Sequence, residues 1–343
     1  MQESNEKGWN DTMIYSQHTF GEDNACLLLG KTYLEENGSV AMPWSDSGFA
    51  FRFSGTGFIL HFAPFADPAV PYVRVWVDGK AQRFAIANGN EKVIFEDLEK
   101  GVHTVKVMRV VEGMECLYAT ELTLVGDAPK LLEAPRERPL RLAFIGDSIT
   151  CGYGVLGNSA QPGYVTYEQD SSRSYAYMTA DLLNAEVMLS GASGKGIVAN
   201  CEGNREDMTL RQAFAWLNRQ GGEWNHSVWT PHLTVINAGT NDAWGGVSDE
   251  EFIEAAKLLM GEVREAYPEK PILYCYGVMD QTKMGAVEKA VAQFNETHGN
   301  AYFLGVESMN QVPGEVGGGG HPNLNTSYRV SALLAEKIKE ILK

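Results

Sequence analysis

The 343-residue chain is long enough for about two domains, and its 44% hydrophobic and 21% charged residues are typical of a protein with buried cores. Its 44 acidic residues outnumber the 28 basic ones, which gives a formal net charge of −16. Nucleic acid and anionic membrane surfaces are therefore not expected partners, because both would be repelled. A neutral substrate fits the charge better.

The N-terminal stretch shows no basic segment followed by an apolar run, and no window of about 18 apolar residues occurs in the sequence. We therefore expect no membrane span and a cytoplasmic location, or a secreted protein if a leader has been lost. The five cysteines are odd in number and include no CxxC pair, which fits reduced thiols and predicts no zinc site.

Short runs that alternate apolar with other residues predict β-strands between about residues 20 and 126. The clearest are "FAFRF" (49–53), "FILHF" (58–62), "YVRVWV" (72–77) and "HTVKVM" (103–108). Asp78-Gly79 and Asn88-Gly89 predict type I′ hairpin turns, since both central residues of such a turn need positive φ. We assign residues 1–126 to a jelly-roll-like β-sandwich domain, and whether this domain touches a substrate stays open.

Residues 127–139 contain three prolines among charged residues, which predicts a linker and disfavours a helix or a central strand. From residue 140 to 343 the periodicity changes. Continuous apolar runs predict strands buried on both faces at 142–145, 185–189, 233–237, 272–278 and 301–306. Helical spacing lies between them, most clearly after Ser248, a predicted N-cap. The alternation predicts a three-layer α/β/α domain with a parallel sheet and a ligand site at the carboxyl ends of its strands.

Polar or glycine-rich segments follow four of these predicted strands. Ser148 lies in "GDSITCG" after the first strand, and "SGASGKG" (190–196) follows the second. "NAGTND" (237–242) follows the third strand, and "GGGGHPN" (317–323) follows the last. Together they supply a hydroxyl, free backbone N–H groups, an amide and an imidazole, which are the groups that acyl transfer requires.

Each segment also has a structural interpretation when it is taken alone. The glycines between 191 and 196 suit an ordinary turn, and Asn241 suits a turn or a helix cap. His321 is one of seven histidines, and Ser148 lies among common turn residues. The presence of all four segments in this order favours the catalytic interpretation.

The blocks "GDSITCG", "GASG", "GTND" and "HPN" resemble the four sequence blocks of the SGNH (GDSL-type) hydrolases, and from first to last they span nearly the whole stretch 140–343. The resemblance implies that Ser148 is the nucleophile and His321 its general base. It also implies an oxyanion hole made by the backbone N–H groups of Ser148 and Gly194 and the side-chain amide of Asn241. Asp147 and Asp242, next to these residues, are expected to hold loops.

A β-sandwich placed before such a domain is similar to carbohydrate esterase family two, the acetyl esterases that act on plant polysaccharides. This narrower resemblance implies an acetylated oligosaccharide or polysaccharide as the partner and a reaction that needs no metal or organic cofactor. Trp244 and Tyr153, close to the blocks in sequence, are candidates for stacking on a sugar ring, although either could simply pack a loop.

One position departs from the SGNH pattern. Most members of the superfamily carry an aspartate three residues before the histidine, where this sequence has Gly318. A main-chain carbonyl of the glycine run 317–320, Glu315 and Asp280 are the candidates to replace it. We favour the carbonyl, because glycines allow the chain to fold tightly beside the imidazole ring.

Two other functions stay open at this stage. The same catalytic residues could serve a lipase-like or thioester-cleaving hydrolase that takes a longer acyl group. The missing aspartate also allows a carbohydrate-binding protein whose hydrolase domain has decayed. The sequence specifies neither the polysaccharide, the acetylated hydroxyl nor the oligomeric state.

Overall fold

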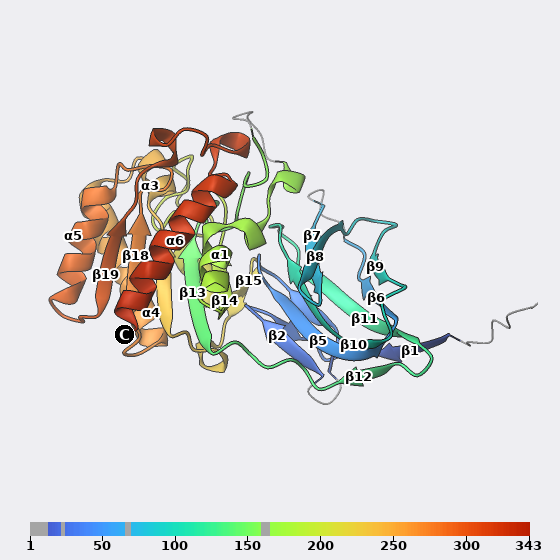
Figure 1. The fold of residues 1–343 in the computed structure, drawn as a ribbon. Coiled ribbons are helices and arrows are strands. Elements are labelled where there is room, and N and C mark those ends of the chain that lie inside the picture. The colour runs from blue at the N-terminus through green and yellow to red at the C-terminus, as the bar shows by residue number, and fades with distance from the viewer. Residues whose placement is uncertain (1–12, 22–24, 66–69, 159–164) are drawn as a thin grey trace, which may run out of the picture.

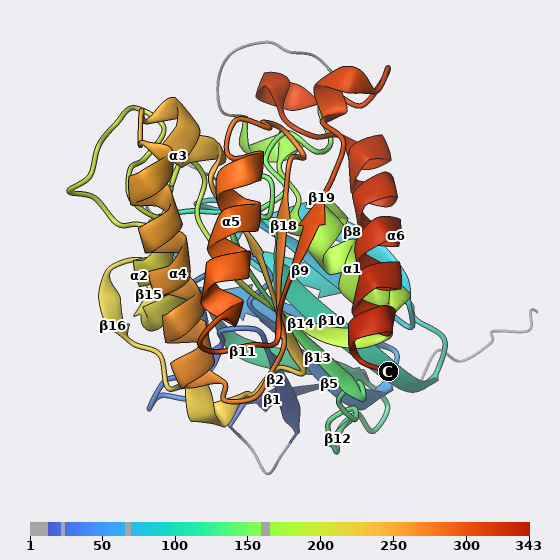
Figure 2. The ribbon, with the colours of Figure 1, turned by 90° about the vertical axis from the view of Figure 1, so that its left-hand side faces the viewer.

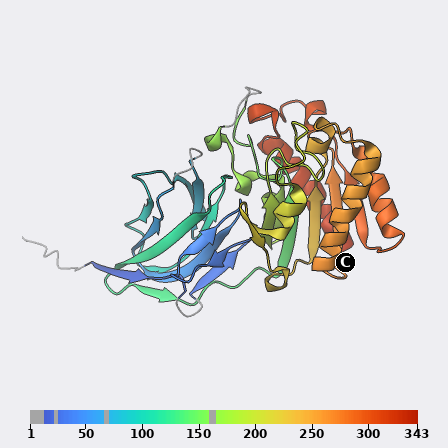
Figure 3. The ribbon, with the colours of Figure 1, turned by 180° about the vertical axis from the view of Figure 1, so that it is seen from behind.

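A computed structural model describes residues 13–21, 25–65, 70–158 and 165–343. Two layered units lie side by side in it, a β-sandwich and an α/β unit (Figures 1 and 3). The first twelve residues, on which the expectation about a leader depends, lie outside the described residues. The predicted fold class is confirmed.

The sandwich consists of two antiparallel sheets. The first sheet contains, in spatial order, β3 (Tyr33–Leu34), β4 (Val40–Met42), β11 (Leu117–Gly126), β6 (Gly57–Phe62) and β9 (Lys92–Phe95), with β1 (Ile14–His18) also paired to β11. The second contains β12 (Lys130–Leu132), β5 (Gly48–Gly55), β10 (Gly101–Arg109), β7 (Tyr72–Val77) and β8 (Lys80–Ala85), with β2 (Cys26–Leu29) also paired to β5.

The alternation of residues in β5 explains how the sandwich core forms. Phe49, Phe51 and Phe53 point to one side because side chains along a strand alternate between its faces, and all three are buried. Phe51 meets Phe58 of the facing sheet edge-to-face, with ring centroids 5.6 Å apart. Such a pair adds about 0.5 to 1.5 kcal/mol beyond the area that it buries.

The two predicted hairpin turns have different outcomes. Asp78 and Gly79, with φ of 49° and 82°, confirm the type I′ turn between β7 and β8. The same prediction is wrong at Asn88-Gly89, where Gly89 alone has positive φ. The flanking residues there form only an isolated bridge, so no pair of twisted strands demands the I′ geometry.

The segment predicted as a linker contains a short strand. β12 lies at the edge of the second sheet, where Leu131 pairs with Phe53 of β5. Prolines flank this strand without interrupting it, which is compatible with an edge position.

The α/β unit is built on a five-stranded parallel sheet in the order β14 (Ala185–Gly191), β13 (Leu140–Gly146), β17 (Leu233–Asn237), β18 (Ile272–Tyr276) and β19 (Ala301–Gly305). The chain first passes from β13 to β14 and then returns to the other side of β13. The strand order therefore reverses between β13 and β17, and ligands of such sheets bind at the carboxyl ends beside that point.

Helices cover both faces of this sheet. Figure 2 shows α4 (Asp249–Ala266) and α5 (Met284–Asn295) on one side and α1 (Tyr175–Leu182) and α6 (Leu324–Ile341) on the other. α2 (Leu210–Ala215) packs in the core on the α4 side, and α3 (Thr240–Trp244) follows β17. The predicted cap Ser248 accepts a hydrogen bond from the Glu251 N–H. Within the described residues, no helix combines the length and apolar character of a bilayer span.

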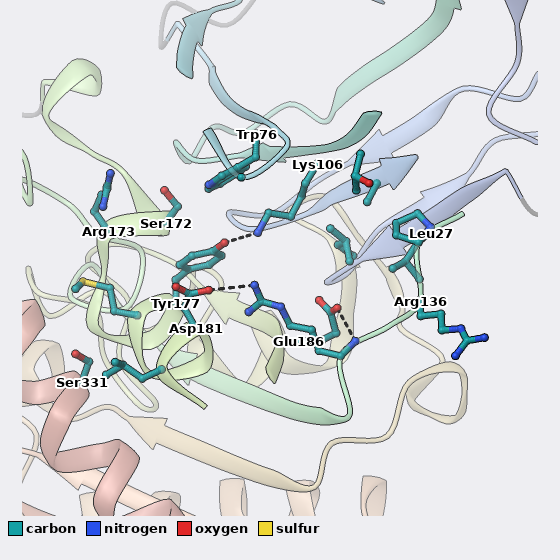
Figure 4. A pocket seen from close by; sticks show the side chains of 18 of the residues that line it. Leu27, Trp76, Lys106, Arg136, Ser172, Arg173, Tyr177, Asp181, Glu186 and Ser331 are labelled. Atoms are coloured by element: carbon teal, nitrogen blue, oxygen red, sulfur yellow. Dashed lines mark hydrogen bonds and ion pairs between the residues drawn. The ribbon is translucent and has the colours of Figure 1, made fainter. Parts of the chain in front are cut away.

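A cavity of about 810 Å³ lies between the two units. Figure 4 shows Lys106 reaching from the sandwich to the Tyr177 hydroxyl of α1, beside Trp76. Nearby, Arg74 of the sandwich pairs with the buried Asp170 that precedes α1. Removing one partner of a buried ion pair generally costs about 3 to 5 kcal/mol, so this contact fixes the two units against each other.

Candidate active site

Ser148 lies in the turn that follows β13, and its side chain is almost fully buried. Its carbonyl accepts the Tyr153 N–H at 3.0 Å, which closes the turn. Gly154 has φ of 65°, and a Cβ there would lie 2.0 Å from the Gly318 carbonyl oxygen. A glycine at 154 therefore permits the serine turn to contact the histidine loop, and Gly318 N donates to the Gly154 carbonyl at 2.8 Å.

His321 lies at the end of that loop and contacts the serine. Its Nε2 is 2.9 Å from Ser148 Oγ. Its Nδ1 is 3.0 Å from the Gly319 carbonyl oxygen, which can only accept a hydrogen bond. We infer that Nδ1 carries the proton and that the Nε2 lone pair faces the serine hydroxyl, as a general base requires.

The Gly319 carbonyl thus occupies the place of the missing acid, as expected. Gly319 has φ of 59°, a left-handed conformation that turns its carbonyl toward the ring and is easily adopted by glycine. The two other candidates are engaged elsewhere. Glu315 pairs with Arg329, and Asp280 accepts the Tyr276 hydroxyl at 2.8 Å.

Gly318, where the superfamily has its aspartate, is tightly enclosed. A Cβ at this position would lie 2.2 Å from Glu168 Oε2 and 3.2 Å from Gly154 Cα. An aspartate at position 318 would therefore require Glu168 to move. The packing around Gly318 thus suits a histidine loop in which a backbone carbonyl, and not an aspartate, bonds to the imidazole.

Asn241 lies between the serine turn and the loop after β14. Its Nδ2 donates to Asp147 Oδ2 at 3.1 Å and to the Lys195 carbonyl at 2.9 Å. It is therefore next to Ser148 on one side and Gly194 on the other. Both amide hydrogens have protein acceptors in this state, so Asn241 must share one of them to bind an oxyanion. Shared hydrogen bonds of this kind are common, and catalytic ones often form fully only with substrate bound.

The two backbone donors expected in the oxyanion hole are the N–H groups of Ser148 and Gly194. Within the described residues, neither the Ser148 N–H nor the Gly194 N–H has a hydrogen-bond partner. Gly194 has φ of 75°, which a glycine adopts without strain. Both N–H groups can therefore serve an incoming anionic oxygen.

The two aspartates hold the loops, as expected. Asp242 accepts the backbone N–H groups of Ile197, Val198 and Ala199. Asp147 accepts the Ile149 N–H at 3.0 Å, and burial raises the pKa of Asp147 to about 7. Neither aspartate bonds to His321, which leaves the imidazole to Ser148 and the Gly319 carbonyl.

The chain matches two known protein families. Residues 144–341 match the GDSL-like lipase/acylhydrolase family. The chain belongs to that family. This match confirms the resemblance inferred from the four sequence blocks. Residues 28–135 of this GDSL-like hydrolase match the carbohydrate esterase 2 N-terminal family, which confirms the narrower resemblance inferred from the β-sandwich that precedes the hydrolase domain.

Two curated relatives carry esterase names. Cellulase/esterase CelE of Acetivibrio thermocellus is 38% identical over 265 residues, which are 75% of this chain and 32% of CelE. An acetylxylan esterase / glucomannan deacetylase of Cellvibrio japonicus is 28% identical over 219 residues, 62% of this chain and 59% of that protein. The GDSL-like hydrolase thus spans about a third and about three fifths of these two relatives.

Solved structures share the whole two-unit architecture. A family two carbohydrate esterase from Clostridium thermocellum, in complex with cellohexaose, has a TM-score of 0.81 and 26% identity, over 92% of this chain and 99% of that one. A family two carbohydrate esterase from Cellvibrio japonicus has a TM-score of 0.85 over 96% and 99%, and at 17% identity it supports the fold alone.

The two aromatic candidates occupy different surroundings. The Tyr153 ring lies against the imidazole of His321, with ring centroids 4.2 Å apart. Trp244, at the end of α3 and one turn after Asn241, is 51% exposed. Trp244 therefore offers a free aromatic surface, whereas Tyr153 already covers one side of the catalytic ring.

A buried carboxylate from the sandwich, which the sequence motifs did not predict, also reaches the site. Glu112, in the loop between β10 and β11, accepts the Ser193 N–H at 2.9 Å and also pairs with Arg219. Ser193 directly precedes Gly194. No motif surrounds Glu112 in the sequence, so only the fold reveals that it reaches the site.

In the described part of the chain, no three His, Cys, Asp or Glu side chains gather closely enough to bind a metal ion. The five cysteines form no disulfide.

The pH dependence of the reaction is expected to reflect the burial of His321. Burial lowers the pKa of His321 below its ordinary value of 6.5, while the Gly319 carbonyl and the charge of Glu112 act in the opposite direction. A lowered pKa keeps the imidazole neutral, and therefore basic, at more acidic pH. We expect the acid limb of kcat/KM for an acetyl ester to have its midpoint below 6.5, as measured by a pH–rate profile. A midpoint above 6.5 would contradict this expectation.

Proposed function

We propose that this GDSL-like hydrolase is a serine esterase that removes O-acetyl groups from plant-type polysaccharides or oligosaccharides. The observation that carries the proposal is the contact of His321 Nε2 with Ser148 Oγ, beside two backbone N–H groups that have no acceptor among the described residues. The esterase names of the relatives support the reaction class, and the acetylxylan and glucomannan names support the substrate class.

The reaction proceeds through an acyl-enzyme. Ser148 Oγ bonds to the acetyl carbonyl carbon while its proton moves to His321 Nε2. The Gly319 carbonyl stabilises the imidazolium through Nδ1–H. The carbonyl oxygen becomes an oxyanion that the N–H groups of Ser148 and Gly194 and the amide of Asn241 bind.

The intermediate then collapses. The bond between the acyl carbon and the sugar oxygen breaks, and that oxygen takes the proton from Nε2. Water then attacks the acetyl-serine with His321 as its base, which releases acetate and restores the Ser148 hydroxyl. The mechanism uses side chains and backbone groups alone, as the resemblance to the hydrolase family implies.

Trp244 is the proposed sugar contact. Its half-exposed ring follows the Asn241 segment and offers apolar area for the face of a sugar. The net charge of −16 suits a neutral glycan better than an anionic lipid.

The acyl group is tested with 4-nitrophenyl acetate, butyrate and octanoate. We expect kcat/KM to be highest for 4-nitrophenyl acetate, because the acyl group of the proposed natural substrate is acetyl. Faster cleavage of octanoate would favour a lipase-like or thioester-cleaving enzyme.

The glycan is tested by incubation with acetylated glucomannan, acetylated xylan and acetylated cello-oligosaccharides. Release of acetate, followed by mass, is expected from at least one of them and not from the Ser148→Ala control. Binding of these glycans without acetate release, and no reaction with a fluorophosphonate, would instead indicate a binding protein with a decayed site.

A further inference from the structure

Glu112 is a sandwich residue whose carboxylate lies in the wall of the α/β unit's active site. It is buried, and four groups of the α/β unit bond to it. They are the Ser193 N–H at 2.9 Å, the Ser193 hydroxyl, Gln169 Nε2 at 3.0 Å and the Arg219 guanidinium. A buried carboxylate with this many donors is firmly held in one position.

These donors come from three separate segments. Ser193 belongs to the loop after β14, Gln169 precedes α1, and Arg219 lies between β15 (Trp216–Asn218) and β16 (Gly221–Glu223). Gln169 Nε2 also donates to the Cys151 carbonyl of the serine turn at 3.2 Å. One carboxylate therefore connects the loop that carries Gly194 with the turn that carries Ser148.

The loop that carries Glu112 is itself fixed. Val110 and Val111 are buried in the core beneath α1 and α6. The Val110 carbonyl accepts the Ser171 N–H at 2.9 Å. Burial alone would raise the pKa of Glu112, but the charge of Arg219 and the bonds from Ser193 lower it below its ordinary range, so the group is a carboxylate at neutral pH.

We propose that the β-sandwich contributes Glu112 as a positioning residue that holds the Ser193–Gly194 peptide, and with it one oxyanion donor, in place for catalysis. This inference rests on the esterase function proposed above. Glu112 does not itself touch the reacting atoms: its carboxylate fixes Ser193 from both the backbone N–H and the hydroxyl. The Gly194 N–H that follows is thereby oriented before substrate arrives.

The effect of losing this anchor follows from oxyanion chemistry. Removing an oxyanion donor outright costs about 10² to 10³ in rate, and a small misplacement of a catalytic group costs up to about 10². We expect Glu112→Ala to lower kcat by roughly 10- to 100-fold with KM nearly unchanged, because the ground-state ester does not depend on the hole. Glu112→Gln keeps one acceptor for the Ser193 N–H, so its loss should be smaller.

Asp46→Asn is the matched control. Asp46 is also a buried sandwich carboxyl, and its Oδ1 accepts the Ser171 hydroxyl of the α/β unit at 2.6 Å. Within the described residues, no hydrogen bond or ion pair joins its carboxylate to the Ser193–Gly194 loop. The variants are compared at about pH 8, above the pKa of about 7 to which burial raises Asp46. At that pH, Asp46→Asn and Glu112→Gln each remove a buried charge at the interface between the two units.

The experiment measures kcat and KM on 4-nitrophenyl acetate per active site, counted by fluorophosphonate labelling to completion, together with the thermal midpoint of each variant. The proposal expects a lower kcat per labelled site in Glu112→Gln and lower still in Glu112→Ala, with Asp46→Asn within about two-fold of the wild type. If Glu112→Gln turns over at the wild-type rate per labelled site, or matches Asp46→Asn, Glu112 is only structural and the proposal is wrong. Failure of the wild type to cleave the ester would instead refute the esterase function itself.

Discussion

Replacement of Ser148 or His321 by alanine is expected to lower kcat on an acetyl ester by about 10⁵ to 10⁶ in either case, because a nucleophile and its base act as one unit. The 2.9 Å contact between Ser148 Oγ and His321 Nε2 is the basis for this expectation. Residual hydrolysis should remain, because an intact oxyanion hole still accelerates the reaction with water by about 10³ to 10⁴. Initial rates at high enzyme concentration measure both variants.

Glu315→Ala is the informative companion of these variants. Glu315 is the nearest carboxylate in sequence to His321 among the candidates considered, yet it pairs with Arg329 through both of its oxygens. We expect this variant to keep most of the wild-type kcat per folded molecule, with some loss of thermal stability because Arg329 loses its partner. An equal loss of kcat in Glu315→Ala and His321→Ala would show that Glu315, rather than the Gly319 carbonyl, supports the imidazole.

Asn241→Ala is expected to lower kcat by about 10² to 10³ while KM changes little, since it removes a donor that acts on the transition state. The fold should survive, because Asn241 lies in the short helix α3, outside the strands of the parallel sheet. Kinetics on 4-nitrophenyl acetate with a parallel thermal melt test this prediction.

Asn200→Ala serves as its control. Asn200 is also buried, and its Oδ1 accepts the Gly196 N–H at 3.3 Å, so it supports the same loop. Within the described residues, its side chain forms no hydrogen bond with the serine turn. Its loss should lower the thermal midpoint with little effect on kcat. If Asn241→Ala behaves like Asn200→Ala, then Asn241 only ties Asp147 to the Lys195 carbonyl and is not an oxyanion donor.

The β-sandwich contacts the α/β unit through several polar side chains. Glu112, Arg74 and Lys106 reach the α/β unit from three places on the sandwich. A cavity of about 810 Å³ lies along this interface, and Ser148, Gly194, Asn241 and His321 do not line it. Of these three side chains, Glu112 is the one that contacts the loop of the candidate site.

The parts of this protein that depend on local sequence were predictable. The alternating and the continuous apolar runs both predicted strands that the structure contains, because period is a property of a few neighbouring residues. β17 and β18 are buried along their whole length as predicted, but the prediction of full burial is wrong for β19, which lies at the edge of the sheet and is only half-buried at Tyr302, Phe303 and Leu304. Phe252, Ala256, Leu259 and Val263 form the predicted helical stripe of α4, and all four are buried. Parallel topology then brings the strand ends together, so Ser148 and Asn241 were expected at one edge.

Turn and edge details were less predictable. Asn88-Gly89 carries the sequence of a type I′ turn, but the surrounding residues form only one bridge and let Asn88 keep an ordinary φ. Leu131 lies among prolines and charges, yet the open edge of β5 offers backbone partners to a short strand. In both cases contacts from outside the segment decided the conformation.

The sequence alone determined which serine and histidine are the candidates and which strands carry them, because motifs and periodicity depend on short stretches of neighbouring residues. Only the tertiary structure decided what orients them. The carbonyl of Gly319 replaces an aspartate through one left-handed glycine, and Glu112 enters from a different domain. A backbone carbonyl has no signature in the sequence, and a contact between residues 81 positions apart depends on how two folded units pack.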